Sequence, residues 1–217
     1  NLYYLKTWGG TWSEYGGAPA QTEWDALRAY INANNMGDPT AFAYVDARYN
    51  WKSLVDYFCI NSYTVCTDWL NWNTAWWHGL DPAGEHKKWG YALWDNDATF
   101  GHYINYTGVP DDTPAADPCN AEQLPDPGGQ GHTQILSKLI AENPTVHDYY
   151  VNRYIDLGNT YFSCDFMLPF LDSLIANNWG AGTNEVAAVT ADGSLTLVNT
   201  TVTGEARQGS NGYGLSI

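Results

Sequence analysis

Apolar residues recur every three to four positions in several stretches, which is the spacing of helices that bury one face. The first helix is predicted to open at Thr22 and to end near Gly37. A shorter helix follows, for which Asp38 is the predicted N-cap and Pro39 the first helical residue. Asn50 is the predicted cap of a buried central helix over 51–66 (WKSLVDYFCINSYTVC), and three further helices are predicted over 133–142, 144–161 and 164–178.

Strand patterns are fewer and shorter. Residues 1–6 (NLYYLK) read as a strand, and residues 74–77 and 89–94 read as a hairpin around the turn Asp81–Gly84. The glycine-rich stretch 7–19 has its glycines in adjacent pairs, which fits no phosphate-binding loop, and it is interpreted as a plain loop.

Residues 179–217 have no helical period and show alternation at Leu195, Leu197 and Val202. The pattern predicts an α+β fold: a helical domain over 1–178 with a small hairpin, followed by a short β-like segment over 179–217. That segment is either a tail or the start of a β module.

Composition narrows the class of partner. The chain has 217 residues with a net charge of −15, which disfavours nucleic acid and anionic membranes and favours a secreted or cell-surface protein. Its four cysteines are compatible with such a compartment, and it has no apolar run of the ~20 residues that a membrane helix needs. Eleven Trp and sixteen Tyr predict an aromatic core, or alternatively an exposed aromatic surface for sugars or partners.

The candidate chemistry lies between Thr67 and Gly101. Asp68 and Asn73 are five positions apart, and Asp95 and Asp97 follow the second strand of the hairpin. Carboxylate and carboxamide oxygens are the ligands that Mg²⁺ prefers, with Ca²⁺ as the alternative. An Asp, an Asn five residues later and an Asp beyond the next hairpin follow the logic of the protein-kinase catalytic loop.

The segments DWLNWN and WGYALWDNDATFG resemble the signature segments of the CotH kinase family of secreted atypical kinases, with a likeness over about residues 1–178. The resemblance implies a protein-kinase-like fold of the C-lobe type and Mg²⁺-dependent phosphoryl transfer from ATP to the hydroxyls of a protein substrate. It implies that Asp68 is the catalytic base, that Asn73 and Asp95 are metal ligands, and that Asp97 supports them. His102, just past the Asp pair, is a candidate contact for phosphate or substrate.

Kinases also hold the nucleotide phosphates with a Lys paired to a Glu. Lys6 and Glu23 are the nearby candidates, and neither stands in a recognisable kinase context. By resemblance the nucleotide-clamping lobe is expected before Asn1, so this chain alone is expected to bind a divalent cation and to transfer phosphate poorly.

Two other functions stay open at this point. One is a non-catalytic extracellular module of the same fold that binds carbohydrate or metal through its aromatic residues. The other is a structural subunit of an extracellular assembly joined through the β-like segment. Nucleotide binding, glycan binding and concentration-dependent assembly would distinguish the three.

Overall fold

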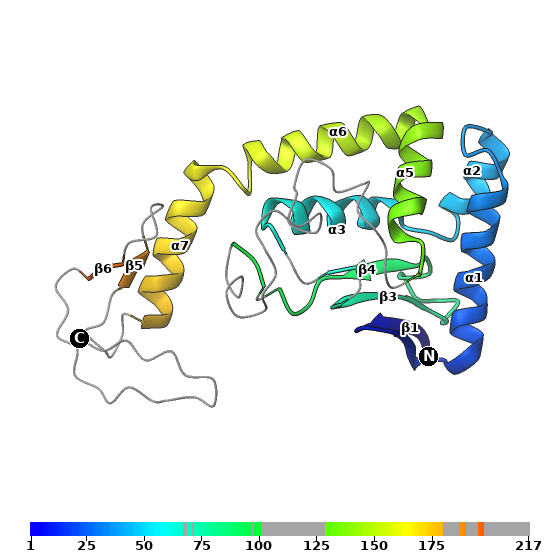
Figure 1. Cartoon of the computed structure of the whole chain (residues 1–217), viewed down its shortest axis with the longest axis horizontal. Coiled ribbons are helices and arrows are strands. Elements are labelled where there is room, and N and C mark those ends of the chain that lie inside the picture. Colours follow the sequence, from blue (N-terminus) through cyan, green and yellow to red (C-terminus); the bar gives the residue numbers. More distant parts are fainter. Residues whose placement is uncertain are drawn as a thin grey trace. The chain divides into compact units, whose positions relative to one another are not determined.

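The chain divides into two compact units, Asn1–Asn159 and Thr160–Ile217 (Figure 1). This computed structural model describes residues 1–66, 69–70, 72–96, 98–100, 129–179, 187–189 and 195–197, with side chains up to 174. These residues show a mixed α+β fold with a four-stranded antiparallel sheet and six helices.

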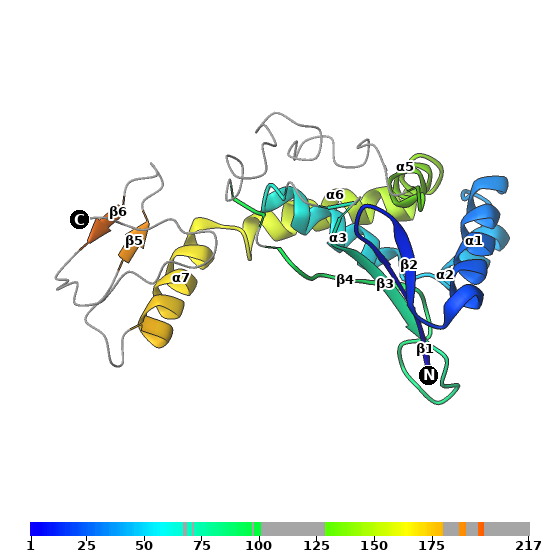
Figure 2. The same ribbon diagram turned by 60° about the horizontal axis from the view of Figure 1, so that its bottom comes forward.

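The first unit is built on that sheet, whose strand order is β2–β1–β3–β4 (Figure 2). The strands are β1 Leu2–Thr7, β2 Thr11–Tyr15, β3 Thr74–Gly79 and β4 Gly90–Ala92. The predicted N-terminal strand and the predicted hairpin are both confirmed. The plain loop over 7–19 was wrong, because it contains β2, which pairs with β1 across a turn where Gly9 has a φ of 69°.

Five helices belong to this unit. They are α1 Gly17–Ala33, α2 Pro39–Asp46, α3 Trp51–Tyr63, α5 His132–Glu142 and α6 Pro144–Asn159. The predicted caps are confirmed: the Asp38 carboxylate accepts from Thr40 N and Ala41 N, and Asn50 accepts from Ser53 N. The first helix begins five residues before Thr22, whose hydroxyl instead donates to the carbonyl oxygen of Ala18.

The central helix is shorter than predicted. α3 ends at Tyr63 with Thr64 as its C-cap, so Cys66 lies beyond it. Val65 has a φ of 48°, a left-handed conformation that a helix cannot continue through. The buried residues of α3 include the predicted apolar stripe of Trp51, Leu54, Val55 and Phe58.

The core lies between one face of the sheet and helices α1, α3 and α5. Leu5, Trp76 and Tyr91 are opposite one another on neighbouring strands and face these helices, and Leu5 and Trp76 are fully buried. Trp24 of α1 packs against four further rings, those of Tyr49, Trp76, Trp89 and His132. The predicted aromatic core is therefore present.

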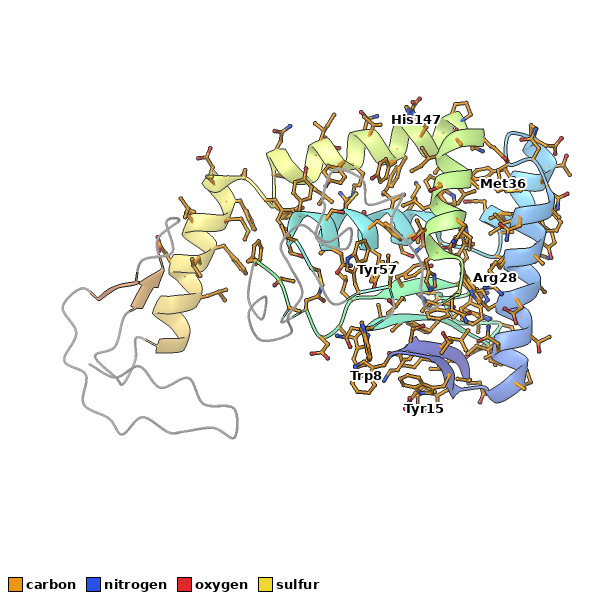
Figure 3. The ribbon with its side chains drawn as sticks, viewed as in Figure 1. Trp8, Tyr15, Arg28, Met36, Tyr57 and His147 are labelled. Atoms are coloured by element: carbon orange, nitrogen blue, oxygen red, sulfur yellow. The ribbon has the colours of Figure 1, made fainter. Side chains whose placement is uncertain are left out.

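The opposite face of the sheet also carries aromatic side chains. Tyr4, Trp12 and Trp77 alternate with the core positions and point away from the helices. Trp8 and Tyr15 are 61% and 57% exposed, and Figure 3 shows both on the β1 side of the sheet, with Tyr57 on the α3 side. Both predicted kinds of aromatic site, a core and an exposed surface, thus occur in one unit.

The second unit contains α7 Cys164–Trp179, β5 Ala187–Val189 and β6 Leu195–Leu197. Ser163 caps α7, since its hydroxyl accepts from Phe166 N at 3.3 Å. β5 and β6 pair antiparallel, which fits the alternation seen at Leu195 and Leu197, whereas Val202 lies outside the described residues. The domain boundary at 178 remains a prediction. No helix in the described part of the chain is long and apolar enough to cross a membrane.

Candidate active site

The two segments with candidate chemistry meet at one end of the β3–β4 hairpin. Ala75 of β3 pairs with Ala92 of β4 in antiparallel register. Asn73 directly precedes β3, and Asp95 follows the last residue of β4 by three positions. Antiparallel pairing places the start of one strand beside the end of the other, so Asn73 and Asp95 lie at the same edge of the sheet.

Hydrogen bonds connect the second segment to the end of α3. Phe100 N donates to the carbonyl oxygen of Thr64 at 2.7 Å, and Asn96 Nδ2 donates to Asn61 Oδ1 at 3.3 Å. Asn61 also accepts at its carbonyl oxygen from Cys66 N at 2.9 Å. The α3 terminus, which leads into Asp68, and the segment that carries Asp95 are thus held together.

Backbone strain is concentrated in these two segments. The described non-glycine residues with positive φ are Val65, Leu70, Asn73, Asp95 and Phe100, with φ between 48° and 67°. Such conformations are uncommon for residues with a Cβ, and they cluster at functional sites, where the surrounding structure imposes them. Both described candidate ligands are among the five.

Bulky side chains fix the loop between α3 and β3. Trp69 is 4% exposed and packs edge-on against Phe58 at 5.0 Å between ring centroids. Trp72 lies against the β1–β2 turn, where a Cβ on Gly9 would come within 3.1 Å of its ring, and it meets Trp8 edge-on at 5.1 Å. The residue before Asn73 is therefore wedged against another hairpin.

Hydrogen-bonded tyrosines support the same hairpin from the core side. Tyr57 of α3 shares a hydrogen bond of 3.0 Å with the hydroxyl of Thr74, the residue after Asn73. Tyr91 of β4 lies 3.0 Å from the Tyr49 hydroxyl and 2.6 Å from His132 Nδ1. Burial raises the pKa of Tyr49 well above its usual range, so this hydroxyl keeps its proton at physiological pH.

Two of the five predicted site residues fall within the described chain. Asn73 is 5% exposed, whereas Asp95 is exposed at the surface. Asp68, Asp97 and His102 lie outside the described residues, so their convergence with Asn73 and Asp95 stays a prediction. A carboxylate and a carboxamide at one sheet edge are the oxygen donors that Mg²⁺ takes. Within the described part of the chain, no three His, Cys, Asp or Glu residues cluster as a metal site would require.

The histidine near the end of β3, beside the hairpin turn, is buried and not solvated. His78 is 7% exposed, and its Nε2 lies 2.9 Å from Glu23 Oε1. The same carboxylate oxygen accepts from Trp89 Nε1 at 3.2 Å. Glu23 of α1 is therefore engaged with β3 and the residue before β4. Of the two nearby candidates for a phosphate-holding Lys–Glu pair, Glu23 thus has other partners than Lys6.

Lys6 has a different environment, which sequence reasoning missed. Its Nζ lies 3.9 Å from Glu14 Oε2 and 4.4 Å from the centroid of the Trp94 ring, next to Asp95. One signal was available in the sequence: Lys6 is the only Lys or Arg on the strands of this sheet. Because residues 7–19 were interpreted as a loop, the neighbouring strand β2, which carries Glu14, was not predicted.

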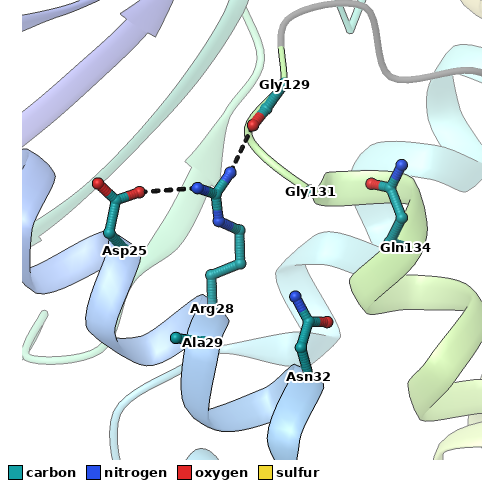
Figure 4. Close-up of a pocket in the computed structure, with 7 residues that line it drawn as sticks. All are labelled: Asp25, Arg28, Ala29, Asn32, Gly129, Gly131 and Gln134. Atoms are coloured by element: carbon teal, nitrogen blue, oxygen red, sulfur yellow. Dashed lines mark hydrogen bonds and ion pairs between the residues drawn. The ribbon is translucent and has the colours of Figure 1, made fainter.

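A shallow hollow lies between α1 and α5, apart from the β3–β4 hairpin end (Figure 4). Its lining residues are Asp25, Arg28, Ala29, Asn32, Gly129, Gly131 and Gln134. Arg28 donates to Asp25 at 3.0 Å and to the carbonyl oxygen of Gly129, and Trp24 Nε1 donates to the carbonyl oxygen of Gln130. These contacts anchor the chain that enters α5.

A known protein family matches this chain over most of its length. Searches of curated proteins and of solved structures gave no significant match. The family model described as CotH kinase protein matches residues 8–179, which is more than half of the chain and includes both candidate segments. This chain therefore belongs to the CotH kinase protein family.

Proposed function

We propose that the chain carries the base and metal side of an atypical kinase site, for Mg²⁺-dependent transfer of phosphate from ATP to protein hydroxyls. Family membership implies use of ATP. The observation that carries the proposal is the placement of Asn73 and Asp95, both with left-handed backbone, at the same end of a paired hairpin. α3 before the loop, the hairpin after it and helices α5 and α6 beyond follow the order of a kinase C-lobe.

In this proposal each residue has one role. Asp68 accepts the proton of the substrate hydroxyl as its oxygen bonds to the γ-phosphorus and the bond to the β-phosphate oxygen breaks, releasing ADP. Asn73 and Asp95 would hold Mg²⁺, with Asp97 supporting them and His102 contacting phosphate or substrate. When bound, the metal would neutralise charge on the phosphates. The buried environment of Asn73 limits its motion, so its carboxamide needs little ordering when a ligand binds.

The test is a radiolabelled-ATP assay with this chain, an N-terminally extended version, and the variants Asp68→Ala and Asp95→Ala. Asp81→Ala is the matched control, because Asp81 lies in the turn at the opposite end of the hairpin and accepts from Ala83 N. We expect labelling to need Asp68 and Asp95 and to be stronger in the extended version. Labelling that persists in both variants would contradict the proposal.

Location outside the cell is part of this proposal. The net charge of −15 supports it, since a strongly acidic surface suits salty surroundings. Fractionation of the source cells, with detection of this chain by antibody, would test it.

A second candidate is carbohydrate binding without catalysis. The exposed aromatic rings around the β1–β2 hairpin favour it: Trp8 is 61%, Tyr15 57% and Trp12 40% exposed. Large exposed aromatic patches mark interaction sites more often than chance. A glycan array would detect this function, and binding lost in Trp8→Ala and Trp12→Ala but kept in Asp95→Ala would favour it over the kinase.

A further inference from the structure

The ammonium group of Lys6 is held beside the segment that carries Asp95. Lys6 belongs to β1, and its Nζ lies 4.4 Å from the ring centroid of Trp94, the residue before Asp95. The Lys6 side chain is 18% exposed, so most of its length is covered while its charge stays near the surface.

The sheet register explains how Lys6 reaches that far. Lys6 is opposite Ala75 on β3, and Ala75 is opposite Ala92 on β4, so the three side chains form one row on the same face. Two alanines in succession leave space across which a long side chain can extend. Ala75 is fully buried although it lies on the face away from the helices, as expected if Lys6 and Trp94 cover it.

Two groups keep the Lys6 ammonium in place. The Trp94 ring attracts it through a cation–π interaction, and Glu14 of β2 lies 3.9 Å away. The Glu14 side chain is 37% exposed, so this ion pair is weak and the ammonium can exchange partners. The indole Nε1–H of Trp94 is buried and has no hydrogen-bond partner in the part of the chain that the structure describes.

We propose that Lys6 binds the polyphosphate of the nucleotide at the Asp95 edge of the sheet, with Glu14 as its positioning residue. This inference rests on the proposed kinase function. A chain with net charge −15 repels ATP, and Lys6 is the only Lys or Arg on the strands that form this edge. On binding, the ammonium turns from the Trp94 ring to phosphate oxygens and forms charge-assisted hydrogen bonds, with no covalent step.

The experiment compares wild type with Lys6→Met, Lys6→Arg and Glu14→Gln. Methionine keeps an unbranched side chain over Trp94 and removes the charge. Lys52→Met is the matched control, since the Lys52 ammonium also lies near rings, those of Trp51 and Tyr149, but on α3. Titration calorimetry would measure the affinities for Mg·ATP, Mg·tripolyphosphate and adenosine, and circular dichroism would confirm folding.

We expect Lys6→Met to weaken both Mg·ATP and Mg·tripolyphosphate by about tenfold or more and to leave adenosine binding unchanged. Lys6→Arg should retain most of the affinity, Glu14→Gln should lose less than Lys6→Met, and Lys52→Met should match wild type. Unchanged polyphosphate affinity in folded Lys6→Met, beside a wild type that binds and transfers phosphate, would overturn this inference and leave the kinase function standing. A wild type, including its N-terminally extended version, that binds no nucleotide would overturn both.

Discussion

The backbone nitrogen of Phe100 donates a hydrogen bond of 2.7 Å to the carbonyl oxygen of Thr64, the C-cap residue of α3. This bond joins the end of the Asp95 segment to the helix that leads into Asp68. A carbonyl at a helix end has no partner within the helix, so the bond satisfies one of its free acceptors. The two halves of the candidate site are thereby linked through the main chain and not through the ligands alone.

Removing that donor should separate the two halves. Phe100 has a φ of 52°, which proline cannot adopt, and Phe100→Pro also removes the N–H. Phe100→Gly keeps the N–H and allows the positive φ, so it is the matched control. We expect Phe100→Pro to lose Mg·ATP affinity by about tenfold or more, while Phe100→Gly stays close to wild type. Equal affinities in the two variants would show that the Thr64 bond does not organise the site.

The two Asp residues of the second segment should differ in their contribution to metal binding. Asp95 directly follows Trp94 and has a left-handed backbone with a φ of 55°, which turns the chain at this point. We expect Asp95→Asn to weaken Mg²⁺ binding more than Asp97→Asn, because the turn breaks the alternation that would put both carboxylates on one face. Calorimetric Mg²⁺ titration of both variants measures this, and equal losses would contradict it.

The carboxylate of Glu142, far from the candidate site, should make the stability of the fold depend on pH. The Lys138 ammonium donates to Glu142 Oε1 at 2.6 Å, and Met36 N donates to its other oxygen at 2.8 Å. These two bonds lower the pKa of Glu142 below its ordinary value of 4.5. A lowered folded-state pKa stabilises the fold above the unfolded pKa, and the contribution is lost as pH falls through the folded value.

Glu142→Gln should therefore be less stable than wild type at neutral pH, with a melting temperature about 2–4 °C lower. The difference should shrink below pH 4.5, where the wild-type carboxylate begins to gain its proton. Melting curves between about pH 3 and about pH 7 measure this dependence. Asp148→Asn is a suitable control, because the Asp148 side chain is 75% exposed. A difference independent of pH would argue for packing and against charge.

The cysteines should differ in reactivity. Cys59 and Cys66 are both buried and are not joined to each other by a disulfide. Burial, followed by the nearby Asp56 carboxylate, raises the pKa of the Cys59 thiol to about 12. Cys164 is exposed.

Alkylation of the native protein at about pH 8, close to the usual thiol pKa, should thus label Cys164 and spare Cys59. A protonated, buried thiol is a poor nucleophile. Peptide mass mapping after iodoacetamide identifies the labelled positions. Unfolding in guanidinium before alkylation supplies the control, because Cys59 should then react. Rapid labelling of Cys59 in the folded protein would contradict the buried position of α3.

Local features of this chain were predictable from its sequence. Asp38 and Asn50 cap their helices as expected, and the β3–β4 hairpin carries Asn73 and Asp95 to one edge. Caps and hairpins depend on residues a few positions apart, so the sequence contains the information directly. The family could also be recognised, since its motifs are short segments with fixed spacing. The ends of α1 and α3 were missed by a few residues, because packing and cap geometry decide where helices stop.

Only the tertiary structure decided which distant residues meet. Glu23 pairs with His78 and not with Lys6, and Lys6 reaches Trp94 across two alanines. The sequence interpretation missed β2 for the same reason, because these residues form a strand only through their pairing with β1. These contacts depend on the register of strands that are far apart in the chain, and a shift of one residue would send each side chain to the opposite face. The spacing of motifs could therefore locate the candidate site in the sequence, while strand register determined which charged group lies beside it.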